Sequence, residues 1–379
     1  MKHIKYLTIM LITIFLSLSA FCLAEEAIKL PDSPMNGLTI FLEKRCIRCH
    51  SLQSDEKTFG PDLIKSLKND DIFRIYGKLW SHSPQMFKYM EKKDISHPIF
   101  KRDEMKAVLD FLYFLNFFTE KGDVESGRAF FTNSICSKCH AIGRHGKRDG
   151  ISLDKYKIYM SPIYLATSLW NHGLDMKFQL SAGKYGWPEL KGSDLSSLSQ
   201  FIVDFATEKD TRRVYSLSGS PVKGKMVFED IGCLSCHKKN VYYDKRQKSA
   251  LDIASDMWKG GPKMWTAMKS GGMKIPEFTA DEFVDLVAYL YFINYPGREG
   301  DEDSGKEVFD NNCSRCHDNG PGPALKEIRG RHDYLDLMTT MWNHSEDMLN
   351  VAKEKGVTWP RFLGHDMNDL LKFLVKDNR

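Results

Sequence analysis

Four copies of the pentapeptide Cys-x-x-Cys-His divide a chain of 379 residues and use eight of its nine cysteines. The copies are Cys46–His50, Cys136–His140, Cys233–His237 and Cys313–His317. This pattern is the attachment signature of haem c. Two thiols one helical turn apart can add to the two vinyl groups of one porphyrin, and the imidazole that follows then lies under the iron. The sequence therefore predicts four haem c groups, bound covalently through thioethers.

Each pentapeptide assigns its own residues to this role. The expected thioether anchors are Cys46, Cys49, Cys136, Cys139, Cys233, Cys236, Cys313 and Cys316. The expected proximal iron ligands are His50, His140, His237 and His317. Paired cysteines can also bind zinc or form disulfides in redox enzymes. Neither use requires a histidine directly after every second cysteine, so both are less favoured than haem.

The ninth cysteine, Cys22, falls in an N-terminal segment that resembles an export signal. Lys2 and Lys5 precede an apolar run, which ends with Ala24 before two acidic residues. This predicts a signal peptide over residues 1–24 and a periplasmic protein. Because the run is close to the length of a membrane span, an uncleaved anchor on the periplasmic side is the alternative. A lipid-modified Cys22 is less favoured, since the residue before it, Phe21, is large.

The composition indicates a globular protein and excludes some functions. Hydrophobic residues make up 42% of the chain, so disorder is excluded. Lys and Arg number 54 against 50 Asp and Glu, a formal net charge of +4. This balance argues against nucleic acid as a partner. Nine cysteines are also too few for a disulfide-stapled scaffold.

The repetition extends beyond the pentapeptides. Upstream of each, a glycine is followed four residues later by phenylalanine: Gly37 and Phe41, Gly127 and Phe131, Gly224 and Phe228, Gly305 and Phe309. Downstream, a tryptophan is followed by methionine after six residues and by proline after 18: Trp80, Met86, Pro98; Trp170, Met176, Pro188; Trp258, Met264, Pro276; Trp342, Met348, Pro360. Amphipathic stretches after each proline predict final helices. We expect the tryptophans to pack on the porphyrin.

This periodicity predicts an all-α fold of tandem units, each with a helix, an attachment turn, a variable loop, a second helix, a proline loop and a final helix. The predicted boundaries are 25–120, 121–215, 216–298 and 299–379. The phenylalanine of each first helix should face the haem or a partner helix.

The units resemble class I c-type cytochrome domains. The resemblance rests on the Gly-x-x-x-Phe helix, the pentapeptide, the segments Gly60-Pro61-x-Leu63 and Gly322-Pro323-x-Leu325, and the final helix ending in an aromatic–aliphatic pair. Four such units cover nearly the whole chain after the leader. The resemblance implies helical domains, each wrapped around one iron whose sixth position is usually filled by methionine.

The usual position of that methionine, next to the proline before the last helix, is here occupied by other residues: His97, Trp187, Ile275 and Trp359. We therefore expect the sixth ligands to be the methionines of the second helix: Met86, Met176, Met264 and Met348. The alternatives are the histidines four residues earlier, His82, His172 and His344, and two local candidates, His97 and Met273. The third unit has Gly260 in place of this histidine and is the shortest between pentapeptide and tryptophan.

These features favour a non-enzymatic electron carrier with periplasmic redox partners, such as a quinol-oxidising complex, an oxidase or a reductase. One alternative is a haem enzyme or gas sensor with one open iron, in the third unit above all. Another is an electron-transfer subunit of a membrane-associated respiratory complex, which would associate peripherally with the membrane.

Overall fold

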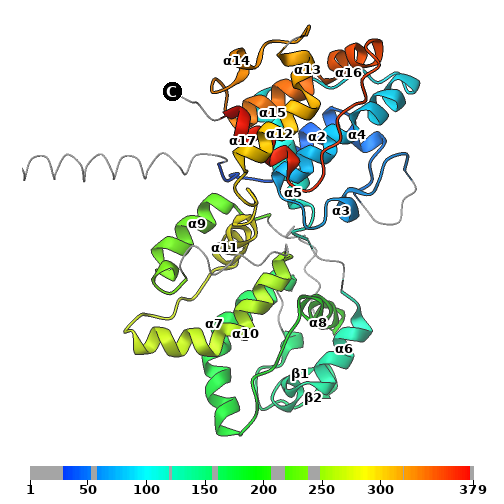
Figure 1. The fold of residues 1–379 in the computed structure, drawn as a ribbon. Coiled ribbons are helices and arrows are strands. Elements are labelled where there is room, and N and C mark those ends of the chain that lie inside the picture. The colour runs from blue at the N-terminus through cyan, green and yellow to red at the C-terminus, as the bar shows by residue number, and fades with distance from the viewer. Residues whose placement is uncertain are drawn as a thin grey trace, which may run out of the picture. The chain divides into compact units, whose positions relative to one another are not determined.

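A computed structural model describes residues 29–52, 58–118, 122–155, 161–205, 218–237, 248–318 and 320–375. The predicted signal peptide, residues 1–24, and Cys22 lie outside them. The described residues are mostly helical (Figure 1), which confirms the all-α prediction. The β-strands in this part of the chain are β1 (Ala141–Ile142) and β2 (His145–Gly146), which pair antiparallel. None of the described helices is long and apolar enough to cross a membrane.

The predicted order of helices recurs four times along the chain, and each copy is called a repeat below. The first helices are α2 (Asn36–Glu43), α6 (Val124–Asn133), α9 (Pro221–Asp230) and α12 (Glu302–Asn312). The attachment turns are η1 (Cys46–Arg48), η2 (Ile135–Lys138), η4 (Cys233–Ser235) and α13 (Ser314–His317). Short elements in the variable loops are α3 (Leu63–Ser66), η3 (Leu153–Lys155) and α14 (Leu325–Ile328).

The middle helices, which carry the tryptophan and the methionine, are equally long. They are α4 (Ile72–Lys92), α7 (Pro162–Ala182) and α10 (Ala250–Ser270), of 21 residues each. In the fourth repeat the equivalent segment is α15 (Tyr334–Asn343) and α16 (Ser345–Glu354), which meet at His344. Side chains of Ser161 and Ser249 cap the first turns of α7 and α10, which fixes where these helices begin.

The last helices are α5 (Arg102–Phe114), α8 (Gly192–Phe205), α11 (Ala280–Phe292) and α17 (Asp366–Val375). Each crosses the first helix of its own repeat at the predicted glycine. A Cβ atom on Gly127 would lie 2.0 Å from the Ser197 carbonyl oxygen, and one on Gly305 would lie 2.0 Å from that of Asp369. Gly37 and Gly224 meet the carbonyl oxygens of Ala107 and Asp285 in the same way. Only glycine permits so close a helix crossing.

The predicted phenylalanines strengthen these crossings. Each packs at a tilt against an aromatic ring of the last helix, with ring centroids 5.4 to 6.0 Å apart: Phe41 against Phe111, Phe131 against Phe201, Phe228 against Tyr289, and Phe309 against Phe373. All four phenylalanines are buried. Of the two partners expected for these side chains, the structure therefore provides the helix.

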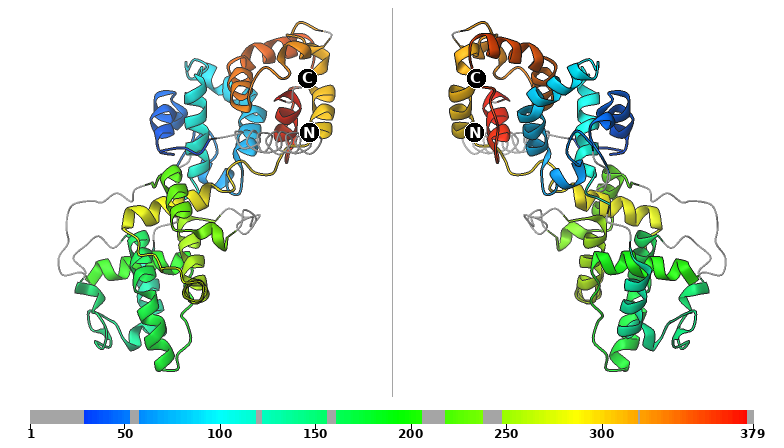
Figure 2. Two further views of the ribbon diagram at one scale, coloured as in Figure 1. Left: turned by 90° about the vertical axis from the view of Figure 1, so that its left-hand side faces the viewer. Right: turned by 90° about the vertical axis from the view of Figure 1, so that its right-hand side faces the viewer.

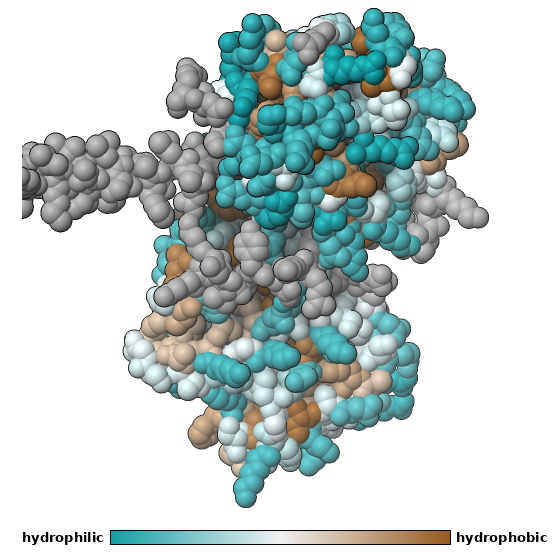
Figure 3. Space-filling view, in the orientation of Figure 1, coloured by the Kyte–Doolittle hydropathy of each residue, from teal (hydrophilic) through white to brown (hydrophobic). Residues whose placement is uncertain are grey.

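The described chain divides into two compact units (Figures 1 and 2). The first contains the described parts of Tyr76–Met105 and Pro296–Arg379, from the first and fourth repeats. The second contains those of Pro31–Ile75 and Lys106–Tyr295, which are the rest of the first repeat and the second and third repeats. On the face in Figure 3, hydrophilic side chains predominate and hydrophobic ones are scattered.

Candidate haem-binding sites

The backbone of every pentapeptide forms the same turn. In each, the carbonyl oxygen of the first cysteine accepts from the N–H of the second cysteine and from that of the histidine. The N···O distances to the second cysteine are 3.0 to 3.2 Å, and those to the histidine are 2.8 to 3.0 Å, in all four copies. The two thiols are thus one turn apart on one short helical segment, as the sequence predicted. All eight cysteines are free thiols.

The chain enters this turn differently in different repeats. Arg45 and Gly232, which directly precede the first cysteine in repeats one and three, have left-handed φ angles of 64° and 82°. In the fourth repeat α12 runs directly into Cys313. This accounts for the spacing of four residues, rather than five, between Phe309 and Cys313.

Three of the proximal histidines have one ring nitrogen fixed by a backbone carbonyl. Nδ1 lies 3.2 Å from the Pro61 oxygen in His50, 2.8 Å from that of Ile151 in His140, and 3.0 Å from that of Pro323 in His317. A carbonyl can only accept, so Nδ1 is the donor in each contact and Nε2 is the ring nitrogen left to bind a metal. Histidines that bind metals are held by such a contact in their usual tautomer. The segment after His237, 238–247, lies outside the described residues.

A glycine packs against the imidazole in the same three repeats. A Cβ atom would lie 2.7 Å from the His50 ring at Gly60, 3.2 Å from the His140 ring at Gly150, and 2.9 Å from the His317 ring at Gly322. The N–H of each glycine also donates to the carbonyl oxygen of the second cysteine. Gly60 and Gly322 belong to the Gly-Pro segments of the sequence. Gly150 was missed because isoleucine follows it, although Ile151 and Pro61 are both eleven residues after their histidines.

The first thiol of each pair faces the protein interior. Burial raises the pKa of Cys46 to about 11 and that of Cys313 to about 12. It also raises the pKa values of Cys136 and Cys233. These thiols therefore stay protonated at neutral pH, unlike the low-pKa thiols of disulfide-exchange enzymes.

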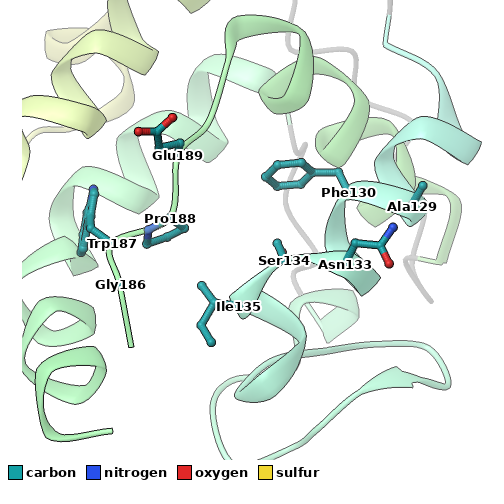
Figure 4. A pocket seen from close by; sticks show the side chains of 9 residues that line it. All are labelled: Ala129, Phe130, Asn133, Ser134, Ile135, Gly186, Trp187, Pro188 and Glu189. Carbon is teal, nitrogen blue, oxygen red and sulfur yellow. The ribbon is translucent and has the colours of Figure 1, made fainter. Parts of the chain in front are cut away.

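A cavity of about 520 Å³ adjoins the attachment turn of the second repeat (Figure 4). One side consists of the end of α6 and the residues before Cys136, including Phe130 and Ile135. The other side consists of the loop before α8, including Trp187 and Pro188. This volume is in the range of protein cofactor pockets. The lining ends at Ile135, directly before Cys136, so the cavity borders the attachment turn. The two thiols and the imidazole with its packed glycine are the donor set that fits a haem here.

The candidate sixth ligands differ in exposure. Met86, Met176, Met264 and Met348 are all half-buried. His172 and His344 are exposed, whereas His82 and Met273 are half-buried. In the third repeat, a Cβ atom added to Gly260 would lie 3.3 Å from the Met264 methyl group. Met86 belongs to the first compact unit and His50 to the second.

Three of the four residues at the usual methionine position contact the tryptophan of a different repeat. Trp187 packs against Trp258 at a tilt, with ring centroids 4.1 Å apart, and Trp359 stacks on Trp80 at 4.6 Å. Their Nε1–H groups donate to the carbonyl oxygens of these same tryptophans. His97 makes both contacts with Trp342. The rings stack with centroids 5.2 Å apart, and Nε2 of His97 lies 3.2 Å from the Trp342 carbonyl oxygen.

Because of this contact, we expect His97 to make the stability of the folded protein depend on pH. Burial lowers its pKa, against the opposing effects of Glu346, the Trp342 carbonyl and Asp347. Nδ1 is buried without a hydrogen-bond partner among the described residues, so a second ring proton is unfavourable in the folded state. The unfolded chain takes up this proton near pH 6.5. Stability present above that pH should therefore be lost as the pH falls through it.

We expect the melting temperature of the wild type to fall more steeply between pH 7.5 and 5.5 than that of a His97→Trp variant. Tryptophan already occupies this position in two other repeats, and its Nε1–H can donate to the Trp342 carbonyl without titrating. Thermal unfolding followed by circular dichroism at several pH values measures the difference. Parallel pH profiles for the two proteins would show that His97 does not titrate with folding.

Comparison with known proteins adds no assignment, since no family model, curated protein or solved structure matches the chain.

Proposed function

We propose that this protein is a tetrahaem c-type cytochrome that carries electrons between redox partners on the exported side of the membrane. The observation that carries the proposal is the identical turn of four Cys-x-x-Cys-His segments, with Nδ1 of three histidines bonded to a carbonyl. When bound, each haem c supplies an iron that alternates between its ferrous and ferric states. The crossed first and last helices of the four repeats support the proposal of four class I cytochrome domains.

The competing uses of the cysteines are less well supported. A structural zinc site needs four ligands, and no group of three or more His, Cys, Asp or Glu side chains that could hold a metal occurs among the described residues. The cysteines are not paired in disulfides. Covalent haem needs only two thiols and one imidazole from each segment, and every copy provides them.

Methionine remains the proposed sixth ligand in each repeat. Support comes from the recurrence of a half-buried methionine on all four middle helices, whereas the histidine four residues earlier is exposed at 172 and 344 and replaced by Gly260. A thioether ligand raises the reduction potential relative to imidazole. We expect low-temperature magnetic circular dichroism of the oxidised protein to show four His/Met signals. Four bis-histidine signals would contradict the methionine assignment and leave the haem count intact.

The carrier proposal predicts that all four irons are six-coordinate. Haem content measured on purified protein should be four per chain, and the reduced protein should bind carbon monoxide slowly and substoichiometrically. Rapid binding at a single haem would favour the second candidate, a haem enzyme or gas sensor with one open iron. The third repeat favours that candidate most, since it lacks the histidine at Gly260.

The partners proposed for the carrier are a quinol-oxidising complex as donor and an oxidase or reductase as acceptor. Membership of a membrane-associated respiratory complex is the alternative. Washing membranes from fractionated cells with salt separates the two, because a free periplasmic carrier should be in the soluble fraction before any wash.

A further inference from the structure

The loop before each last helix is held by the middle helix of a different repeat. We call residues 187–190 the proline loop of repeat two, and residues 97–100, 275–278 and 359–362 its counterparts. In the second compact unit, the Trp258 Nε1–H donates to the Pro188 carbonyl at 2.8 Å, and the Trp170 Nε1–H donates to that of Pro276 at 3.0 Å. The contact between repeats two and three is therefore reciprocal.

A second set of hydrogen bonds repeats the same exchange. The Asn171 side chain accepts from the N–H of Phe278 at 3.0 Å and donates to its carbonyl oxygen at 2.8 Å. In the opposite direction, the buried Ser255 hydroxyl donates to the carbonyl oxygen of Leu190. Each proline loop is thus fixed through its backbone at two points.

The first compact unit shows part of this arrangement between repeats one and four, where the Trp80 Nε1–H has no hydrogen-bond partner among the described residues. The Trp342 Nε1–H donates to the Pro98 carbonyl at 2.7 Å, and Asn343 bonds both backbone groups of Phe100. In return, the Ser81 hydroxyl accepts from the N–H of Phe362 at 2.9 Å. The exchange therefore occurs twice in the molecule, between repeats far apart in one case and adjacent in the other.

The crossing of the middle helices in the second unit explains how they reach the partner loop. Gly173 of α7 faces the ring of Trp265 in α10, where a Cβ atom would lie 2.2 Å from the ring. Trp265 packs in turn against Trp170 and Trp187. The small residue at 173 lets α10 lie close to α7 and place Trp258 beside the proline loop of repeat two.

This proline loop is one wall of the cavity next to Cys136, since Trp187 and Pro188 line it (Figure 4). We infer that the middle-helix tryptophans of repeats two and three are positioning residues for the haem site of the partner repeat, not of their own. Trp258 of repeat three would fix the wall of the second haem site, and Trp170 of repeat two that of the third. This inference rests on the proposed function, because it concerns the same haem sites.

The inference makes a crossed prediction. In the full-length haem-loaded protein, Trp258→Phe keeps an aromatic ring but removes the bond to Pro188, so the wall of the second site should open more readily. Loss of one buried hydrogen bond of this kind should increase the affinity of the second haem for added imidazole about tenfold. The magnetic circular dichroism signal of that haem should shift as well. The third haem, whose own repeat carries the mutation, should keep its signal.

The matched control is Trp80→Phe. Trp80 is the equivalent tryptophan of repeat one, is buried and stacks on Trp359, but its Nε1 has no hydrogen-bond partner among the described residues. This variant loses the same ring area and no hydrogen bond, so the affinity of the fourth haem for imidazole should change much less than that of the second haem does in Trp258→Phe. Signals are assigned to haems with reference chains in which one cysteine pair is replaced by serine.

The reciprocal variant is Asn171→Ala, which should alter the third haem and leave the second unchanged. It keeps the inference testable if Trp258→Phe does not fold. A change confined to the haem of the mutated repeat, or equal changes at both haems, would overturn the inference. So would folded variants with wild-type signals throughout. A chain that carries no haem would instead refute the proposed function.

Discussion

Replacing Cys136 and Cys139 together by serine should reduce the covalently bound haem from four per chain to three. The two thiols lie on one turn of η2 and are the anchors of a single site, and a serine hydroxyl does not form the thioether. The other three segments lie elsewhere in the chain and keep their own turns. Haem absorbance per protein after alkaline pyridine treatment measures the loss, and the mass of the intact chain verifies it.

A Lys138→Ala variant is the control, because this exposed residue lies between the two cysteines and is not an anchor. It should retain four haems. A double-serine protein that still carries four covalent haems would contradict the assignment of this segment. A wild-type protein that carries zinc and no covalent haem would favour the zinc alternative.

Gly127→Ala should destabilise the protein by about 3 kcal/mol, at the upper end of the usual cost of overpacking. The added methyl group would lie 2.0 Å from the Ser197 carbonyl oxygen and 2.9 Å from the Phe201 Cβ atom. The obstacle is backbone, so α6 and α8 must separate. This should also loosen the ring contact between Phe131 and Phe201. Urea unfolding followed by circular dichroism measures the change in the free energy of unfolding.

Gly271→Ala is the matched control for this substitution. Gly271 ends α10 with a negative φ, and the nearest atom to an added Cβ is the Ala267 carbonyl oxygen at 3.4 Å. Alanine there makes an ordinary contact and restricts the unfolded chain, so its stability should be equal to or slightly above that of the wild type. Equal losses in both variants would show that the helix crossing at Gly127 is not sterically limiting.

Much of the fold follows from spacings within a short segment. A spacing of four residues from Gly127 to Phe131 places both on one face of a helix, and the structure packs that face against α8. The attachment turn is equally local, because its hydrogen bonds join residues three and four apart. The division of the fourth middle helix at His344 was not foreseen from the regular spacing of Trp342 and Met348.

The candidate sites were predicted less completely. The cysteines, the histidines and the Gly-Pro segments carry their pattern in the sequence. Gly150 has no such pattern. The residue after it is Ile151, whose carbonyl oxygen contacts His140 as that of Pro61 contacts His50, but which is not a proline. The tryptophans were expected to pack on porphyrin, and their hydrogen bonds to another repeat have no signal in the spacing that a single repeat displays.

By itself, then, the sequence determined the helical class, the fourfold repetition, the turns of the pentapeptides and the residues proposed as iron ligands. Each of these features depends on residues that are only a few positions apart in the sequence. Within one helix or turn, such residues lie on the same face. The tertiary structure decided that repeat one pairs with repeat four and repeat two with repeat three. The bonds that make these pairs join residues 65 to 281 positions apart, such as Ser255 to Leu190 and Phe362 to Ser81. Such bonds form only after the helices have folded and packed, so no local pattern can specify which repeat supplies the partner.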